Sequence, residues 1–233
     1  MNEKHFKIRK DLSLKIGDIT IFRIEATRDL DIHNVKKGDI GGYIEKEENL
    51  SKNAWVSGNA RVYGDARVSG NARVYGNARV YGNACVSGDA WVYGDARVSG
   101  NACVSGDARV YGDAWVYGDA RVYGDACVSG NACVSGNAWV YGDARVSGNA
   151  CVSGDARVEK RGDCINIANA RYNITILPEH IQIGCQFHQK QEWWGYSDRK
   201  IIAMDGKNGL KWWKKWKAIL QAICSEMEIE NER

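Results

Sequence analysis

The segment Asn53-Ala-Trp-Val-Ser-Gly-Asn-Ala-Arg-Val-Tyr-Gly64 holds two copies of a six-residue unit that fills the centre of the chain. The unit reads Asn or Asp, Ala, then Arg, Trp or Cys, then Val, Ser or Tyr, and Gly. It runs without a gap from Asn53 to Gly154, which makes 17 copies, and an eighteenth at 155–160 ends differently. A repeat of this length decides the fold of about half of the chain.

Within each unit, Ala and Val alternate with two variable positions. A period of two is typical of a short strand with Ala and Val on its inner side. Gly followed by Asn or Asp is typical of a corner, because these residues tolerate positive φ better than most others. We therefore predict strands of about four residues joined by two-residue corners. Three units would make a coil of 18 residues, and six coils would make a rod roughly 29 Å long.

This repeat resembles the hexapeptide family of left-handed parallel β-helices. The resemblance implies a mainly β fold, a left-handed parallel β-helix of about six coils. A weaker form of the repeat precedes Asn53, because Ile44, Leu50 and Val56 are also spaced six residues apart. We predict an N-terminal cap over residues 1–43, the hexapeptide β-helix over 44–160, and a C-terminal cap over 161–233. The stretches 23–30 and 35–51 further resemble the leader of uncharacterised hexapeptide proteins of phages and prophages.

The two ends lack the repeat. A strand is predicted at Ile19–Ile24, and three more at 164–168, 173–177 and 180–184, which either finish the rod or fold over its end. Two helices are predicted after them, the first N-capped by Ser197 and covering 198–204, the second covering about 209–227.

The second predicted helix is amphipathic. An apolar stripe at helical spacing is formed by Trp212, Trp216, Ile219 and Ile223, and the lysines lie largely opposite. We expect the tryptophans to plug the open end of the rod and the lysines to face solvent. A basic helix of this kind that binds a membrane, nucleic acid or an acidic partner is the alternative.

Residues 18 apart should stack on one face, so the outward columns can be written down from the sequence. Arg beside Trp can form cation–π pairs, and Trp, Tyr and Arg are enriched in interface hot spots. The alternative is that these ladders only support neighbouring coils, because aromatic residues also stabilise sheets. The candidate binding residues are Trp55, Arg73, Trp91, Arg109, Tyr75, Tyr93, Tyr111, Arg61, Arg79, Arg97, Lys211, Lys214 and Lys215.

Catalytic and metal chemistry are disfavoured. Acyltransferases of the hexapeptide family use a His base and usually a protruding loop, whereas this repeat has no insertion and no His. The group His180, Cys185 and His188 has an irregular spacing for zinc. The stacked cysteine pairs 85/103 and 133/151 are expected to be structural. We therefore predict no enzyme activity, no cofactor and no metal site.

The remaining composition favours a cytoplasmic binding protein. Met1–Asp11 is polar and basic, unlike a secretory signal, and no apolar stretch approaches ~18 residues, so we expect no membrane partner. The eight Cys do not have the spacing of a disulfide framework. We expect a non-catalytic, phage-derived protein that binds a host protein or nucleoprotein, with a defence component as one candidate. A self-assembling scaffold and a nucleic-acid binder are the alternatives, although 9 Arg and 9 Asp make the repeats neutral.

Overall fold

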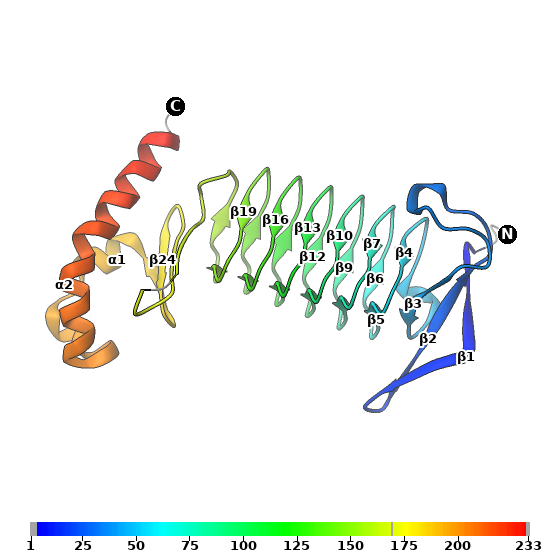
Figure 1. The fold of residues 1–233 in the computed structure, drawn as a ribbon. Helices are drawn as coiled ribbons and strands as arrows, with labels where there is room; N and C mark the ends of the chain where they lie inside the picture. The colour runs from blue at the N-terminus through cyan, green and yellow to red at the C-terminus, as the bar shows by residue number, and fades with distance from the viewer. Residues whose placement is uncertain (1–3, 169, 232–233) are drawn as a thin grey trace.

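The chain winds into a rod with a hairpin at its N-terminal end and a small sheet with helices at its C-terminal end (Figure 1). This computed structural model describes residues 4–168 and 170–231, the side chains of 228–231 apart. Three parallel ladders run along the rod, and strands three units apart in sequence are neighbours in each ladder. The predicted β-solenoid of about six coils, with 18 residues per coil, is therefore confirmed.

We name the three sides of the rod by the strands that form them. The first face consists of β4 (Trp55–Val56), β7 (Arg73–Val74), β10 (Trp91–Val92), β13 (Arg109–Val110), β16 (Cys127–Val128) and β19 (Arg145–Val146). The second face consists of β3 (Ile40–Ile44), β5 (Arg61–Val62), β8 (Arg79–Val80), β11 (Arg97–Val98), β14 (Trp115–Val116), β17 (Cys133–Val134) and β20 (Cys151–Val152). The third face consists of β6 (Arg67–Val68), β9 (Cys85–Val86), β12 (Cys103–Val104), β15 (Arg121–Val122), β18 (Trp139–Val140) and β21 (Arg157–Val158).

The interior of the rod is built from the Ala and Val of every unit. From Ala54 to Val158 these side chains are buried, at 0–2% exposure. The weaker repeat at Ile44 and Leu50 belongs to the same core, since Ile44 lies in register with Val62 and Leu50 bridges to Val68. The strands are two residues long, not the four predicted. Hydrogen bonds between coils nevertheless continue beyond them, as in Tyr63 N to Val80 O at 3.1 Å.

The corners explain why each of the 17 units from Asn53 to Gly154 ends in Gly. Gly100 has φ +67°, a conformation that L side chains rarely adopt. A Cβ added to Gly100 would lie 2.9 Å from the backbone N and O of Gly118 in the next coil. The Asn that follows the corner ties coils together as well, because Asn83 Nδ2 donates to Asn101 Oδ1 at 3.1 Å.

The N-terminal cap extends the sheet of the second face. The strands β1 (Phe6–Ile16) and β2 (Ile19–Ala26) form an antiparallel hairpin, and β2 pairs with β3. The strand predicted at Ile19–Ile24 is thus confirmed, whereas β1 was not predicted. After β2, a loop carries the 3₁₀ turn η1 (Asp31–His33). Apolar residues of the hairpin and of this loop are buried in one cluster with the first coil of the rod, namely Phe6, Ile24, Leu30 and Val35. A second 3₁₀ turn, η2 (Glu47–Asn49), lies in that coil.

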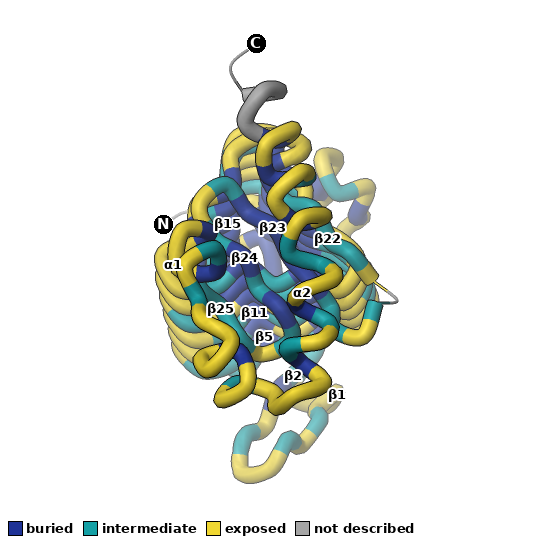
Figure 2. Tube along the Cα trace, turned by 90° about the vertical axis from the view of Figure 1, so that its left-hand side faces the viewer, coloured by how far each residue is buried: buried dark blue, intermediate teal, exposed yellow. Residues whose placement is uncertain are grey.

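At the C-terminal end, a four-stranded antiparallel sheet covers the rod. The three predicted strands are present as β22 (Ile165–Ile167), β23 (Ile174–Ile176) and β24 (His180–Ile183), and an unpredicted β25 (Gln186–Gln189) follows. Cys151 N in the last coil donates to Thr175 Oγ1 at 3.0 Å, and Leu177 joins the rod core. These strands fold across the end of the rod and do not continue its ladders (Figure 2).

Two helical segments follow the sheet on its outer side (Figure 1). A short α1 (Lys190–Gly195) was not predicted. The segment α2 (Asp198–Asn231) is broken at Asp205 and Gly206, which have non-helical backbone angles. The two predicted helices correspond to its two parts. Ser197 Oγ accepts a hydrogen bond from Lys200 N at 3.3 Å, as the predicted N-cap requires.

The prediction that the tryptophan stripe plugs the rod is wrong. The helix packs on the far face of the four-stranded sheet, in a cluster separate from the rod core. Its buried side is also rotated from the predicted stripe, since Ile219 is 42% exposed. Between residues 213 and 227 the buried side chains are those of Trp213, Leu220, Cys224 and Met227. The apolar periodicity of the sequence did not identify the buried side of the helix, because the stripe with Trp213 and Leu220, next to the predicted one, is also apolar.

The corner geometry predicts how two equivalent glycines differ. Gly100 and Gly148 share a φ of +67°, but a Cβ on Gly148 meets only the side-chain Oδ1 of Asn166, at 3.1 Å. We expect Gly148→Ala to lower the free energy of unfolding by about 1–2 kcal/mol, the cost of left-handed backbone for an L-residue. Gly100→Ala should cost more, because the backbone of the next coil must move. Urea denaturation followed by circular dichroism measures both, and equal losses would contradict the argument.

Candidate binding surfaces

The first face begins with a residue that is not available for binding. Trp55 is only 4% exposed, so its assignment to an exposed column needs correction. Its ring lies against the N-terminal cap, where a Cβ on Gly41 would come within 2.8 Å of it. The next residue of the column, Arg73, donates to the carbonyl oxygen of Ile32 in the same cap. The cap therefore covers the start of this face.

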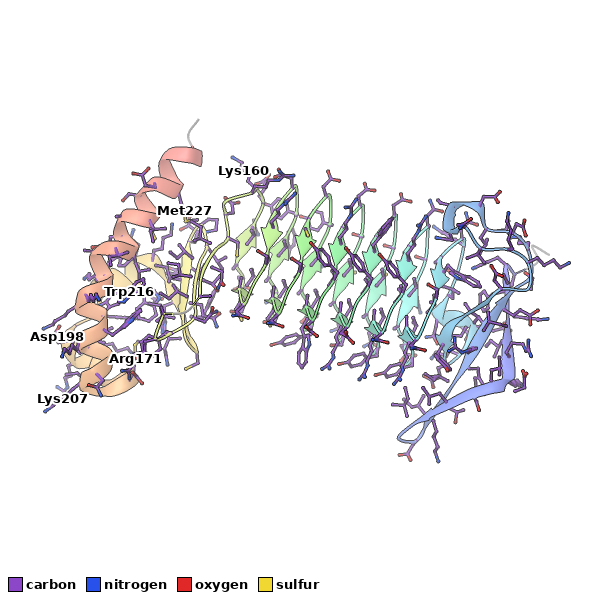
Figure 3. All side chains as sticks on the ribbon, viewed as in Figure 1. Lys160, Arg171, Asp198, Lys207, Trp216 and Met227 are labelled. Carbon is purple, nitrogen blue, oxygen red and sulfur yellow. The ribbon has the colours of Figure 1, made fainter. Side chains whose placement is uncertain are left out.

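Further along the first face, Arg, Trp and Tyr side chains form a stacked array. Trp91 lies between two guanidinium groups, with Arg73 Cζ 4.9 Å and Arg109 Cζ 5.5 Å from the ring centre. The rings of Tyr75, Tyr93 and Tyr111 stack in a row at 4.8 Å. Burial in this stack raises the pKa of Tyr93, so its hydroxyl stays protonated. The predicted columns are thus present, and outward side chains of successive coils form rows along the rod (Figure 3).

The second face carries a longer column than the repeat alone indicates. The predicted run of Arg61, Arg79 and Arg97 is in register on adjacent strands. At one end, Tyr43 of the cap pairs with Arg61, and Arg23 pairs with Tyr43. At the other end, Trp115 of the next coil pairs with Arg97. We call the resulting row the basic ridge: Arg23, Tyr43, Arg61, Arg79, Arg97 and Trp115.

Each end of the basic ridge is a cation–π pair. Arg23 Cζ lies 4.4 Å from the ring centre of Tyr43, and Arg97 Cζ lies 4.6 Å from that of Trp115. Contacts of this type are worth about 0.5–1 kcal/mol at exposed sites and orient both side chains. At ~4.8 Å per strand, the ridge is about 24 Å long.

The basic ridge has a local excess of positive charge. None of its four arginines forms an ion pair with another described residue. Four of the six corner residues that flank Arg61, Arg79 and Arg97 are neutral, namely Asn59, Asn77, Asn83 and Asn101. Of the two acidic ones, Asp65 already pairs with Lys46 at 2.7 Å. The rod is neutral as a whole, but this part of its surface is not.

Trp115 and Tyr117 are more exposed than the other large apolar side chains of the described coils. Trp115 is 46% and Tyr117 is 40% exposed. The cause is their neighbours 18 residues away: Cys133 follows Trp115, and Tyr117 stands between Ser99 and Ser135. Small neighbours leave the rings uncovered. Neither residue was among our candidates, although the 18-residue columns contain the information to find them.

The third face repeats the cation–π arrangement in its second half. Trp139 lies between Arg121 and Arg157, whose Cζ atoms are each 5.2 Å from the ring centre. Its edge contacts Tyr123, as Trp91 contacts Tyr75, and in each pair the residues are 16 apart in sequence. Trp139 is thus a more enclosed counterpart of Trp115.

The C-terminal helix presents the predicted lysines to solvent. Lys211, Lys214 and Lys215 are exposed, and Lys214 Nζ pairs with Asp198 Oδ2 at 2.7 Å. Asp198 and Trp216 are labelled on this helix in Figure 3. Among the residues with described placement, no helix is long and apolar enough to cross a membrane.

His180 and His188 point to opposite faces of the small sheet. His180 stacks on Phe187, which packs against the rod core, at 4.8 Å. His188 lies in register with Ile181 and contacts Trp193 and Tyr196 on the helix side. The candidate zinc ligands of this segment are therefore not brought together.

Cysteine pairs lie on two faces, in the predicted columns. Cys85 is in register with Cys103, and Cys133 with Cys151. The four cysteines of these two pairs are not joined by disulfides. Hydrogen bonding to Cys151, and then to Tyr117 and Ser135, lowers the pKa of Cys133 to about 6, whereas the contact with Cys133 raises that of Cys151. Burial and the neighbouring Cys85 raise the pKa of Cys103.

The geometry defines a β-solenoid repeat protein. The family model described as "YdcK Beta solenoid repeat" matches the chain in nine overlapping segments: 54–70, 66–80, 78–94, 90–106, 96–112, 102–118, 126–142, 138–154 and 144–160. The matched residues, 54–118 and 126–160, lie within the coils, and neither cap is matched. A comparison with curated proteins found no match.

The stacked tyrosines allow a test of whether these columns support the rod. Tyr93→Ser places at this position a residue that other units carry, but removes two ring stacks. At about 0.5–1.5 kcal/mol per aromatic pair, we expect a loss of about 1–3 kcal/mol in the free energy of unfolding. Tyr117→Ser should cost less, because no described ring stacks on Tyr117. Urea unfolding of the two variants measures both losses in the free energy of unfolding. Equal losses would mean that ring stacking contributes nothing to the stability of the rod.

Proposed function

We propose that this protein is a non-catalytic binding protein and that the basic ridge, together with Tyr117, binds an acidic surface of a protein partner. The observation that supports this most is the exposure of Trp115 and Tyr117 at the end of a row of unpaired arginines. Trp, Tyr and Arg are the residue types that most often dominate binding energy at protein interfaces. The first face, which the sequence favoured equally, is partly covered by the cap.

The rigidity of the rod favours binding over catalysis. Every ridge residue stands on a strand that is paired with its neighbours in the sheet, and cation–π contacts hold the side chains at both ends of the ridge. Because these side chains are already ordered, binding loses less conformational entropy than it would on a flexible loop. The acyltransferases of the hexapeptide family, by contrast, use a His as general base, and the repeats contain none.

The origin of the partner is a further part of this proposal. The stretches 23–30 and 35–51 resemble leaders of phage and prophage proteins, which favours a host protein or nucleoprotein in the cytoplasm. Arg23 and Tyr43, the first two residues of the ridge, lie in these two stretches. The leader would then contribute to the binding surface as well as to the cap.

A matched pair of tryptophan variants tests the proposal. The wild-type protein, immobilised, should capture a specific partner from host-cell lysate, whose affinity is then measured by calorimetry with the purified partner. We expect Trp115→Ala to weaken binding by at least about thirtyfold, the effect of losing a hot spot of ~2 kcal/mol. Trp139→Ala, which removes a Trp between two arginines on another face, should change the affinity less than about threefold.

Equal losses from the two variants, or the absence of specific capture, would contradict the proposal. Arg79→Ala provides an independent check, because it removes a charge from the middle of the ridge. Its effect should shrink as salt rises from 50 to 500 mM, since exposed charges are screened.

Nucleic acid is the second candidate, favoured by the same four unpaired arginines. Single-stranded nucleic acid binds to basic grooves with aromatic platforms, and its affinity falls steeply with salt. Fluorescence anisotropy with a labelled single-stranded oligonucleotide at 50 mM salt distinguishes the two candidates. Tight binding that depends on Trp115 would favour nucleic acid over a protein partner.

A further inference from the structure

The column of the basic ridge continues beyond Trp115 into two cysteines. Trp115 is in register with Cys133 on β17, and Cys133 with Cys151 on β20. The two thiols are free and partly exposed. Strand neighbours lie about 4.8 Å apart, which is within the ~4.4–6.8 Å range of Cα separations that disulfides span. The structure thus places an oxidisable pair of thiols on the surface.

The surroundings of the two sulfur atoms are unequal. Cys133 Sγ lies 3.7 Å from the hydroxyl of Tyr117 in the preceding coil, and Ser135 and the Cys151 thiol also hydrogen-bond to it. On the other side, Cys151 contacts Gln182 of β24 and lies near Cys164. Cys133 therefore has three neighbours that can donate to its thiolate, the hydroxyls of Tyr117 and Ser135 and the Cys151 thiol, while Cys151 stays a protonated thiol in contact with it.

We propose that Cys133 and Cys151 form a redox-active dithiol, in which Cys133 attacks low-molecular-weight disulfides and Cys151 resolves the product into a disulfide between two coils. A thiolate that is accessible and hydrogen-bonded, with a second thiol beside it, is the arrangement that thiol–disulfide exchange requires. The inference is independent of the proposed binding function.

The two steps balance as follows. The Cys133 thiolate attacks one sulfur of a disulfide RSSR, so that a Cys133–S–S–R bond forms and RS⁻ leaves. Cys151 then attacks Cys133 Sγ, and its proton leaves with the second RS group as RSH. Overall, two protein thiols are oxidised and one external disulfide is reduced to two thiols. Once Cys133 has reacted, its negative charge no longer raises the pKa of Cys151, which favours the second step.

The position of the pair in the rod also sets it apart. β20 is the last strand of its sheet and pairs only with β17, and beyond it the Cys151 backbone N donates to Thr175 Oγ1 of the C-terminal sheet. The other stacked pair lies on β9 and β12, between β6 and β15 in the middle of their sheet. Sixteen residues before Cys85 and Cys103, at the position where Cys133 has Tyr117, stand Ser69 and Ser87.

The chain offers a control for each feature of the site. Cys127 Sγ lies 3.5 Å from the hydroxyl of Tyr111, but its column neighbours are Arg109 and Arg145, so it has a tyrosine without a second thiol. Cys85 and Cys103 form a pair without such a tyrosine. A reactivity specific to Cys133 therefore cannot come from either feature alone.

The test uses the reduced full-length protein and oxidised glutathione, with products located by peptide mass spectrometry. A thiol of pKa about 6 is roughly a quarter ionised at pH 5.5, whereas an ordinary thiol of pKa ~8.5 is about 0.1% ionised. After allowance for its lower nucleophilicity, Cys133 should react on the order of tenfold faster than Cys127 at this pH. Wild-type protein should end with a 133–151 disulfide.

Variants separate the two steps. Cys151→Ser should stop at glutathionylated Cys133, and Cys133→Ser should abolish reaction at Cys151. Tyr117→Phe, which keeps the ring, should slow Cys133 severalfold at pH 5.5, whereas Tyr111→Phe should leave it unchanged. Equal rates at Cys127 and Cys133, faster reaction at the 85/103 pair, or a stable mixed disulfide in the wild type would each overturn the proposal.

Discussion

Stacking of one coil on the next in strict 18-residue register is the constraint on which the structure depends. It is enforced where backbones meet at the corners, since the glycines of adjacent coils approach too closely for a Cβ, as at Gly100 and Gly118. With these contacts fixed, Ala and Val must point inward and the two variable positions outward. The outer side chains are therefore free to vary without altering the coil, and the surface can specialise while the core repeats.

This constraint explains which parts were predictable from sequence. In-register neighbours such as Trp91 and Arg109, or Cys133 and Cys151, follow from counting 18 residues along the chain. Contacts between a Tyr and a residue 16 positions later follow a similar count, as Tyr117 and Cys133 show, but we did not use it. The exposure of Trp115 could also have been inferred, because its following neighbour is small.

The caps were less predictable because nothing in them repeats. Burial of Trp55 depends on the N-terminal cap, where its ring lies against Gly41 of β3. The pairing of Arg23 with Tyr43 depends on an antiparallel register with an irregularity beside it. At the other end, two apolar stripes compete on one helix, and the sheet against which it packs decides between them. Local patterns identified most of these elements but not what each one covers.

The 18-residue coil also gives the rod a rotational phase. Insertion of three units would move the C-terminal sheet away by about 4.8 Å and leave every column aligned. Insertion of a single unit would instead turn everything beyond it by a third of a revolution, so that residues of the second face would continue a row of another face. The orientation of the C-terminal sheet relative to the N-terminal hairpin is thus encoded in the number of units, counted modulo three.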